Sequence, residues 1–109
     1  MPGVSNVTRI STPKTGTSTS EDTRTEVPKR YRVLLLNDDY TTMEFVVAVL
    51  EQVFCKAHED AVRIMLQVHR QGMGVAGVYV KEIAEMKCVL VHDLAGAHGF
   101  PLHCVMEPE

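Results

Sequence analysis

The sequence predicts an α+β fold in which a small antiparallel sheet of three strands packs against three helices, in the order β-α-α-β-α-β. Short apolar runs of strand length alternate with longer segments whose apolar residues recur at helical spacing. Turn-forming Asn, Asp and Gly residues separate these segments. The chain has 109 residues, 45% of them hydrophobic and 23% charged, which is the size and composition of one globular domain.

Residues 1–28 are predicted to form a disordered N-terminal arm, and residues 29–109 the folded domain. Eleven of the first 28 residues are Ser or Thr, three are Pro, and three basic side chains balance three acidic ones. A segment of this composition cannot bury enough apolar surface to offset the entropy that ordering would cost. The net charge of −3 therefore belongs to the domain, and it argues against binding to nucleic acid.

The first strand is predicted at residues 31–36, and a helix follows it closely. The strand is a buried-looking Tyr-Arg-Val-Leu-Leu-Leu run, and an Asn-Asp-Asp-Tyr turn ends it. Thr41 is the expected N-cap, because Thr41 and Glu44 have the spacing of a capping box. The apolar face of this helix is predicted to comprise Met43, Val46, Val47, Leu50, Val53 and Phe54.

A second helix is predicted from His58 to Gln71, with Gly72 as its C-cap. Its apolar face should comprise Ala61, Ile64, Met65 and Val68. A strand at residues 75–80 follows. Because Ala57 and Val80 are poor N-cap residues, the helices that begin after them should be less stable than well-capped ones.

The third helix is predicted over residues 82–97, and a closing strand follows it. The residues expected to face the core from this helix are Ile83, Met86, Leu90 and Leu94. In the closing strand, alternate residues should point inward, namely Phe100, Leu102, Cys104 and Met106.

The cysteines indicate a reducing compartment. There are three cysteines, Cys55, Cys88 and Cys104. Their odd number and the lack of a CxxC pair argue against a disulfide framework and a structural zinc site. No apolar run approaches the roughly 20 residues that span a bilayer, and the N-terminus lacks the apolar segment of a secretory signal. We therefore expect a cytoplasmic protein that does not bind membranes.

The densest polar cluster is Asn37, Asp38 and Asp39, where the first strand ends. Two adjacent carboxylates at a strand-to-helix junction suit a cation, either a metal ion or an ammonium group. From the residues alone, a role in shaping the turn and capping the helix is the simpler interpretation. His69 lies beside the apolar face of the second helix, and could border a pocket or be a structural histidine.

The sequence motifs bear on whether the protein is an enzyme. No hydrolase, P-loop or dinucleotide-binding motif is present, and the Gly-rich residues 72–77 follow a helix and precede a strand, the wrong order for a phosphate loop. Asp38, Asp39 and His69 could bind a divalent ion, which leaves a metal-dependent enzyme as an alternative.

Residues 31–46, with the sequence Tyr-Arg-Val-Leu-Leu-Leu-Asn-Asp-Asp-Tyr-Thr-Thr-Met-Glu-Phe-Val, closely resemble the signature of the bacterial ClpS adaptor family. Residues 64–69, 77–79, 82–87 and 101–104 match the family in the same order. The resemblance covers about residues 30–107. It implies an adaptor without catalytic residues or cofactors, which binds proteins with a free bulky N-terminal residue (an N-degron: Phe, Tyr, Trp or Leu). The adaptor delivers them to the AAA+ protease of ClpA and ClpP and so modulates its substrate choice.

The resemblance also implies the residues of the binding site. Asn37, Asp39 and His69 should accept hydrogen bonds from the substrate α-ammonium group, and Asp38 should shape the same turn. The pocket for the first side chain should be lined by Leu36, Thr41, Met43, Val46, Met65, Val68 and Leu102. Within this pocket, Met43 matches a gate that disfavours β-branched side chains.

The partner surfaces follow from the same resemblance. Glu82 and Lys87 match exposed residues that dock on the N-terminal domain of ClpA, and the arm is similar in character to the extension that engages the unfoldase. The family acts as a monomer. Thr42 stands where the family usually has Pro, which costs some pre-organisation of the turn. A plain interaction domain that only inhibits the unfoldase remains an alternative.

Overall fold

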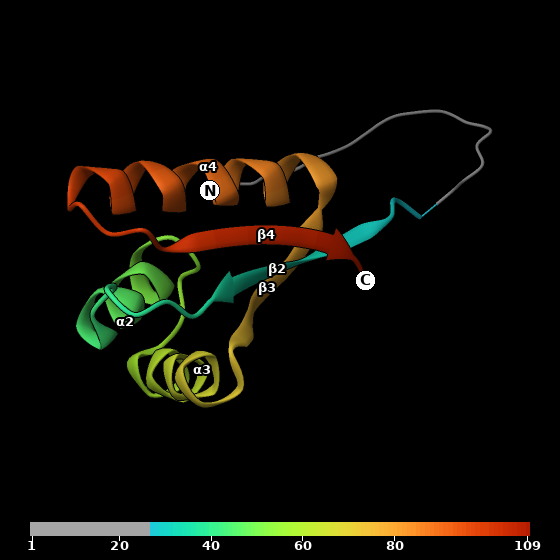
Figure 1. Ribbon diagram of the computed structural model, residues 1–109. Coiled ribbons are helices and arrows are strands. Elements are labelled where there is room, and N and C mark those ends of the chain that lie inside the picture. Colours follow the sequence, from blue (N-terminus) through green and yellow to red (C-terminus); the bar gives the residue numbers. More distant parts are fainter. Residues whose placement is uncertain (1–26) are drawn as a thin grey trace, which may run out of the picture.

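The computed structural model describes residues 27–109, so the predicted arm lies almost wholly outside the described residues. The described chain has the predicted order of elements (Figure 1). The elements are β2 (Arg30–Leu36), α2 (Met43–Gln52), α3 (His58–Gln71), β3 (Met73–Val80), α4 (Lys81–Ala97) and β4 (His103–Pro108). Among residues 27–109, no helix has both the length and the apolar character needed to cross a membrane.

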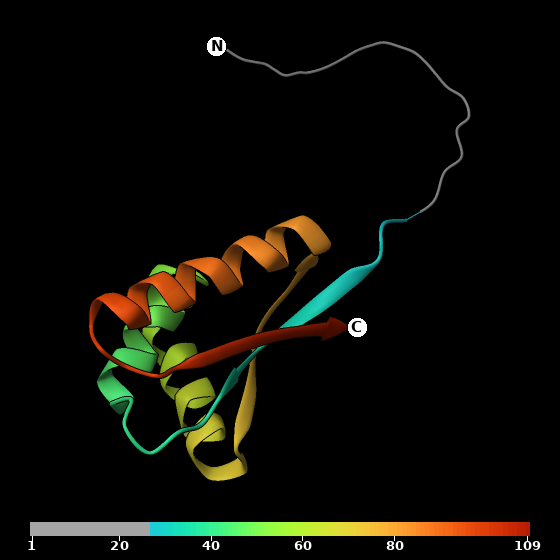
Figure 2. The ribbon, with the colours of Figure 1, turned by 45° about the horizontal axis from the view of Figure 1, so that its top comes forward.

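The strands form one antiparallel sheet in the order β3-β2-β4. β2 is the central strand and has the most buried residues of the three, namely Val33, Leu34 and Leu35. The register with β3 shifts between Val33 and Leu34, where a bulge bends the sheet. α4 runs alongside β4, whereas α2 and α3 gather at the end of the sheet where β2 finishes (Figures 1 and 2).

Helix α2 begins one residue later than predicted, because Thr42 rather than Thr41 is its N-cap. The Thr42 hydroxyl oxygen accepts a hydrogen bond from the Phe45 amide at 3.1 Å. The Thr41 hydroxyl instead donates to the Asp38 carboxylate at 2.7 Å. Thr41 is thus engaged in the preceding turn, and the capping box expected from Thr41 and Glu44 does not form. The buried residues of α2 are Val46, Val49 and Leu50, of which Val49 was not predicted.

Helix α3 has its predicted bounds and its predicted apolar face. Gly72 ends it with φ of 92°, a left-handed conformation that suits glycine, and its amide donates to the Val68 carbonyl. Ala57 makes no side-chain capping bond at the other end, as its apolar side chain requires. The four predicted inward residues, Ala61, Ile64, Met65 and Val68, are all buried.

The predicted orientation of α4 was wrong. Ile83, Met86 and Leu90 were expected to face the core, but their side chains are 36%, 50% and 43% exposed, and only Leu94 packs partly against the core. The residues that α4 buries are Ala84, Val91 and Ala95. Large and small apolar residues recur on this helix with the same spacing, so periodicity alone could not choose between two faces. The alanine face lets the helix axis approach the sheet closely.

A lysine anchors α4 to the rest of the domain. Lys87 is half-buried; its ammonium donates to the Val53 carbonyl at 2.7 Å and lies 5.5 Å from the centre of the Tyr79 ring. Phe100 and Leu102 precede β4 rather than belonging to it; Leu102 and Cys104 are buried, and Phe100 and Met106 pack partly against the core.

Candidate functional site

The turn between β2 and α2 is organised by one carboxylate. Oδ1 of Asp38 accepts hydrogen bonds from the amides of Tyr40 (2.8 Å) and Thr41 (2.7 Å), while Oδ2 accepts the Thr41 hydroxyl. The backbone amide of Asn37 donates to the Gly72 carbonyl at 2.9 Å, which ties the start of this turn to the end of α3. Hydrogen bonds therefore hold the turn both internally, through Asp38, and to the end of α3, through Asn37.

These hydrogen bonds also set the ionisation of Asp38. Burial acts to raise the pKa of its carboxyl group, but the three donated hydrogen bonds outweigh burial and hold the pKa below its ordinary value of 3.8. Asp38 is thus a carboxylate at neutral pH, and its oxygens are already engaged by its own turn.

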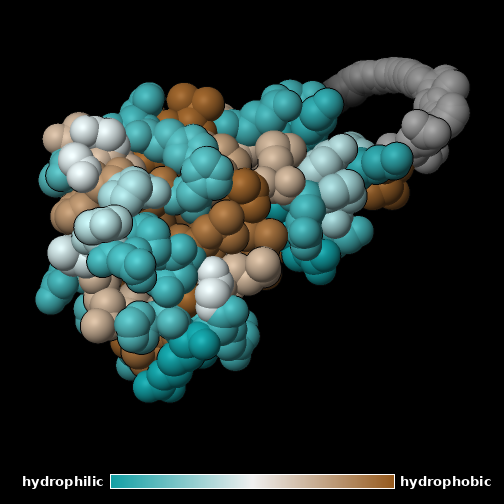
Figure 3. All heavy atoms as spheres, viewed as in Figure 1, coloured by the Kyte–Doolittle hydropathy of each residue, from teal (hydrophilic) through white to brown (hydrophobic). Residues whose placement is uncertain are grey.

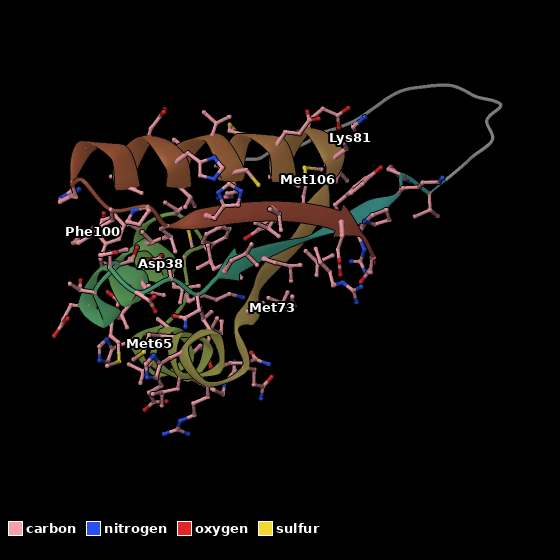
Figure 4. The ribbon with its side chains drawn as sticks, in the orientation of Figure 1. Asp38, Met65, Met73, Lys81, Phe100 and Met106 are labelled. Carbon is pink, nitrogen blue, oxygen red and sulfur yellow. The ribbon has the colours of Figure 1, made fainter. Side chains whose placement is uncertain are left out.

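A cavity of about 420 Å³ opens beside this turn. Its walls come from the turn, the first residues of α2 and one face of α3, and Asp38 and Met65 mark its two sides in Figure 4. The lining residues are Asn37, Asp38, Asp39, Tyr40, Thr41, Thr42, Met43, Glu44, Val46, Met65, Val68 and His69.

The structure brings together nine of the eleven residues that the sequence assigned to the binding pocket. Leu36 and Leu102 are the exceptions: Leu36 is half-buried at the end of β2, and Leu102 is buried in the core. Three lining residues were not predicted, namely Tyr40, Thr42 and Glu44. All three adjoin predicted site residues in the sequence, and this adjacency could have predicted that they line the same cavity.

The cavity has an apolar part and a polar mouth. Val46, Met65 and Val68 are buried and give it apolar walls. Asn37, Asp39 and His69 are exposed at its edge, and within residues 27–109 their side chains make no hydrogen bond or ion pair. Three unoccupied acceptor groups therefore lie next to an apolar hollow.

Two rim features modify access to this hollow. The Met43 side chain is 47% exposed at the first residue of α2. Glu44 follows it and adds a second exposed carboxylate beside Asp39. The mouth is thus negatively charged, and a flexible thioether stands at its rim.

The metal-site alternative finds little support in the geometry. In the part of the chain that the structure describes, no group of three His, Cys, Asp or Glu side chains is placed to hold a metal ion. Asp38, Asp39 and His69 line one cavity, but Asp38 directs its oxygens into the turn.

The two predicted docking residues lie on α4. Glu82 is exposed in the first turn of the helix, whereas Lys87 is half-buried and bonded to Val53. Exposed apolar side chains lie on the same helix, and Figure 3 shows an apolar cluster at the top of the molecule, near α4, and a larger one over the sheet. The exposed apolar residues of α4 are Ile83, Met86, Val89 and Leu90.

Comparison with known proteins gives one consistent family. The model of the family described as "ATP-dependent Clp protease adaptor protein ClpS" matches residues 26–105. A ClpS adapter protein from Desulfatibacillum aliphaticivorans is 62% identical over 86 residues, which are 79% of this chain and 83% of that protein. One from Caulobacter vibrioides is 58% identical over 86 residues, 79% of each chain.

A solved structure is similar as well. The Agrobacterium tumefaciens ClpS2 structure, bound to L-phenylalaninamide, superposes with a TM-score of 0.73 at 46% sequence identity. The similarity covers 76% of this chain and 100% of the Agrobacterium chain.

Proposed function

Because the chain belongs to the ClpS family of ATP-dependent Clp protease adaptors, which are not enzymes, we propose that it binds proteins through a free, bulky hydrophobic N-terminal residue. The bound protein is then delivered to a ClpA-type unfoldase and its ClpP protease. The observation that supports this most strongly is the cavity with apolar walls and with Asn37, Asp39 and His69, whose side chains bond to no other described residue, at its mouth.

The polar mouth suits an α-ammonium group. A free N-terminus has an ordinary pKa of about 7.7–8.0, so near neutral pH it is mostly a cation with three N–H donors. Asn37 Oδ1, the Asp39 carboxylate and a His69 ring nitrogen are the three acceptors we assign to it. An acetylated N-terminus or an internal peptide group lacks the charge and two of the donors.

The apolar walls suit the first side chain. Burying a Phe or Leu side chain contributes roughly 1.5–3 kcal/mol, comparable to the polar contacts, so both are needed for useful affinity. The Agrobacterium relative supports this pairing, because L-phenylalaninamide combines a free α-amino group with an aromatic side chain. Thr41, Val46, Met65 and Val68 form the lining, and Leu36 and Leu102 would support it from the core side.

We assign delivery to α4 and to the N-terminal arm. Glu82 and the exposed apolar residues of α4 offer a surface for the N-terminal domain of the unfoldase. Lys87 would act on the same surface by holding α4 in place through Val53. The arm would engage the unfoldase, and the protein would work as a monomer in the cytoplasm, where its free thiols are stable.

Peptide titration tests the recognition step. A fluorescent peptide that begins with Phe should bind, and the same peptide with an acetylated N-terminus should bind about 100-fold or more weakly, because the acceptors are then left unpaired. A matched peptide that begins with free Ser controls for the side chain. Equal binding of the free and acetylated Phe peptides would contradict the assignment.

Degradation assays distinguish an adaptor from a plain inhibitor. Adding the protein to ClpA and ClpP should accelerate destruction of a Phe-first substrate and slow that of substrates recognised by other signals. Slowing of both substrates would favour the inhibitor alternative.

A further inference from the structure

Two cysteines from different elements meet between α4 and β4. Sγ of Cys88, in the middle of α4, lies 3.4 Å from Sγ of Cys104, on β4. Cys104 is 3% exposed and Cys88 is half-buried, whereas the third cysteine, Cys55, is exposed in the loop between α2 and α3. The two sulfurs are already in van der Waals contact although their residues are 16 positions apart.

We propose that Cys88 and Cys104 form a dithiol site that reacts with small disulfides such as oxidised glutathione and closes into an intramolecular disulfide between α4 and β4. This inference does not depend on N-degron binding. A disulfide has an S–S length near 2.05 Å, so the two sulfurs, which lie 3.4 Å apart, must approach by about 1.4 Å to bond.

The difference in exposure sets the order of the reaction. Cys88 is reached first from solvent: its thiolate attacks one sulfur of oxidised glutathione, the glutathione S–S bond breaks, and one glutathione thiolate leaves and takes up a proton. Cys104 then loses its proton and attacks the Cys88 sulfur of the mixed disulfide, which expels the second glutathione. Two protein thiols are oxidised and one glutathione disulfide is reduced to two thiols.

The surroundings of Cys104 suit a resolving rather than an attacking thiol. Burial, first, and the hydrogen bond to Cys88, second, raise the pKa of the Cys104 thiol above its ordinary value of 9.0, so less of it is present as the reactive thiolate. Its proximity to Cys88 compensates for this in the second step, because the reaction is then intramolecular.

The disulfide would change how α4 is held. In the reduced protein, α4 buries small side chains, and its Lys87 contacts the Val53 carbonyl and the Tyr79 ring of β3. The bond would fix the centre of the helix to an edge strand and would leave its exposed face unchanged. A transient bond of this kind fits a reducing compartment, where persistent disulfides are rare.

Mass spectrometry in a C55S background tests the proposal. After incubation of the folded protein with oxidised glutathione, we expect the mass to fall by two hydrogens, no free thiol to remain, and the urea midpoint to rise. Dithiothreitol should reverse all three changes. The double variant C55S/C104S should stop at a stable glutathione adduct on Cys88, and C55S/C88S should remain unmodified. If C104S does not fold, C104A provides the same readout.

Two results would overturn the proposal. One is a C55S protein that retains glutathione on Cys88 without losing two hydrogens. The other is a Cys88–Cys104 disulfide that forms only in urea and not in the folded protein, because its formation would then not depend on the native contact between the two sulfurs.

Discussion

The four polar residues at the pocket mouth have two different roles. Asp38 accepts three hydrogen bonds within its own turn, whereas the side chains of Asn37, Asp39 and His69 make no hydrogen bond to any other residue of 27–109. Residue type alone does not distinguish the two adjacent aspartates, although the family resemblance assigns the turn to Asp38 and the ammonium contact to Asp39. The backbone conformation separates them, because only Asp38 is positioned to meet the amides of Tyr40 and Thr41.

Replacing Asp38 with Asn should destabilise the protein by about 1 kcal/mol at pH 7, because charge-assisted hydrogen bonds to the turn become neutral ones. The folded-state pKa of Asp38 lies below 3.8, so its contribution is fully present above that pH and is lost as the pH falls through the lowered value. Urea unfolding at pH 7, 5 and 3 should therefore show the difference between wild type and D38N shrinking only at the lowest pH.

The neighbouring substitution D39N is the matched control for D38N. It removes the same charge from a carboxylate outside the turn network, so it should leave the unfolding free energy unchanged while weakening peptide binding. A D38N penalty that does not vary with pH would contradict the assigned role of Asp38.

Replacing Met43 with Ala should allow peptides that begin with Ile or Val to bind. The Met43 side chain is 47% exposed at the pocket rim, so its removal widens the entrance with little cost to the fold. Peptide affinities measured by fluorescence anisotropy check this, and M73A removes a similarly exposed methionine from β3 as a control. An unchanged preference against β-branched residues would rule out the gate.

At the scale of elements, the orientation of a helix could be predicted from the sequence where only one of its faces is apolar. α3 has one buried face and a glycine C-cap, so its bounds and orientation could be read from the sequence. α4 is apolar on several faces, and the choice of the alanine face depends on how closely the helix approaches the sheet. Such a choice is a tertiary effect, which local periodicity does not contain.

The contact between Lys87 and Val53 carries a prediction about α4. Replacing Lys87 with Met should lower the unfolding free energy by about 1–3 kcal/mol, because the carbonyl of the buried residue Val53 loses a charged donor and the Tyr79 ring loses its cation. Urea denaturation measures this, with K81M at the exposed start of α4 as the control. If Lys87 acts only by touching the unfoldase, K87M will be as stable as wild type.

At the scale of the whole molecule, the strand and helix order followed from the sequence, but the site did not follow from periodicity. Asp39 and His69 come from separate segments; residue chemistry grouped them only as a possible metal site, and the family resemblance assigned them to a peptide-binding pocket. The Asn37 bond to Gly72 explains why they meet, because it closes the turn onto the end of α3. The Cys88–Cys104 contact had no local signal either, since it joins elements that pack only in the folded chain.

The pocket lies far from the point where the N-terminal arm joins the domain, so deleting the arm can test its role separately. The pocket lies at one end of the sheet, and the chain enters β2 at the other end, beside the C-terminus (Figure 2). Removing residues 1–28 should therefore leave stability and peptide affinity unchanged and should abolish delivery, as measured by degradation of a Phe-first substrate with ClpA and ClpP. Normal degradation with the truncated protein would contradict the role of the arm.

The position of β2 has a mechanical consequence for any machine that grips the arm. Tension applied upstream enters the domain at Arg30, where the Glu109 amide donates to the Arg30 carbonyl and the two side chains form an ion pair at 2.9 Å. β2 is bonded to a strand on each side, so a pull along its axis loads both hydrogen-bond ladders in shear at once. A terminal strand at the sheet edge would instead give way along a single ladder. The domain is therefore built to withstand a force applied through its own N-terminus.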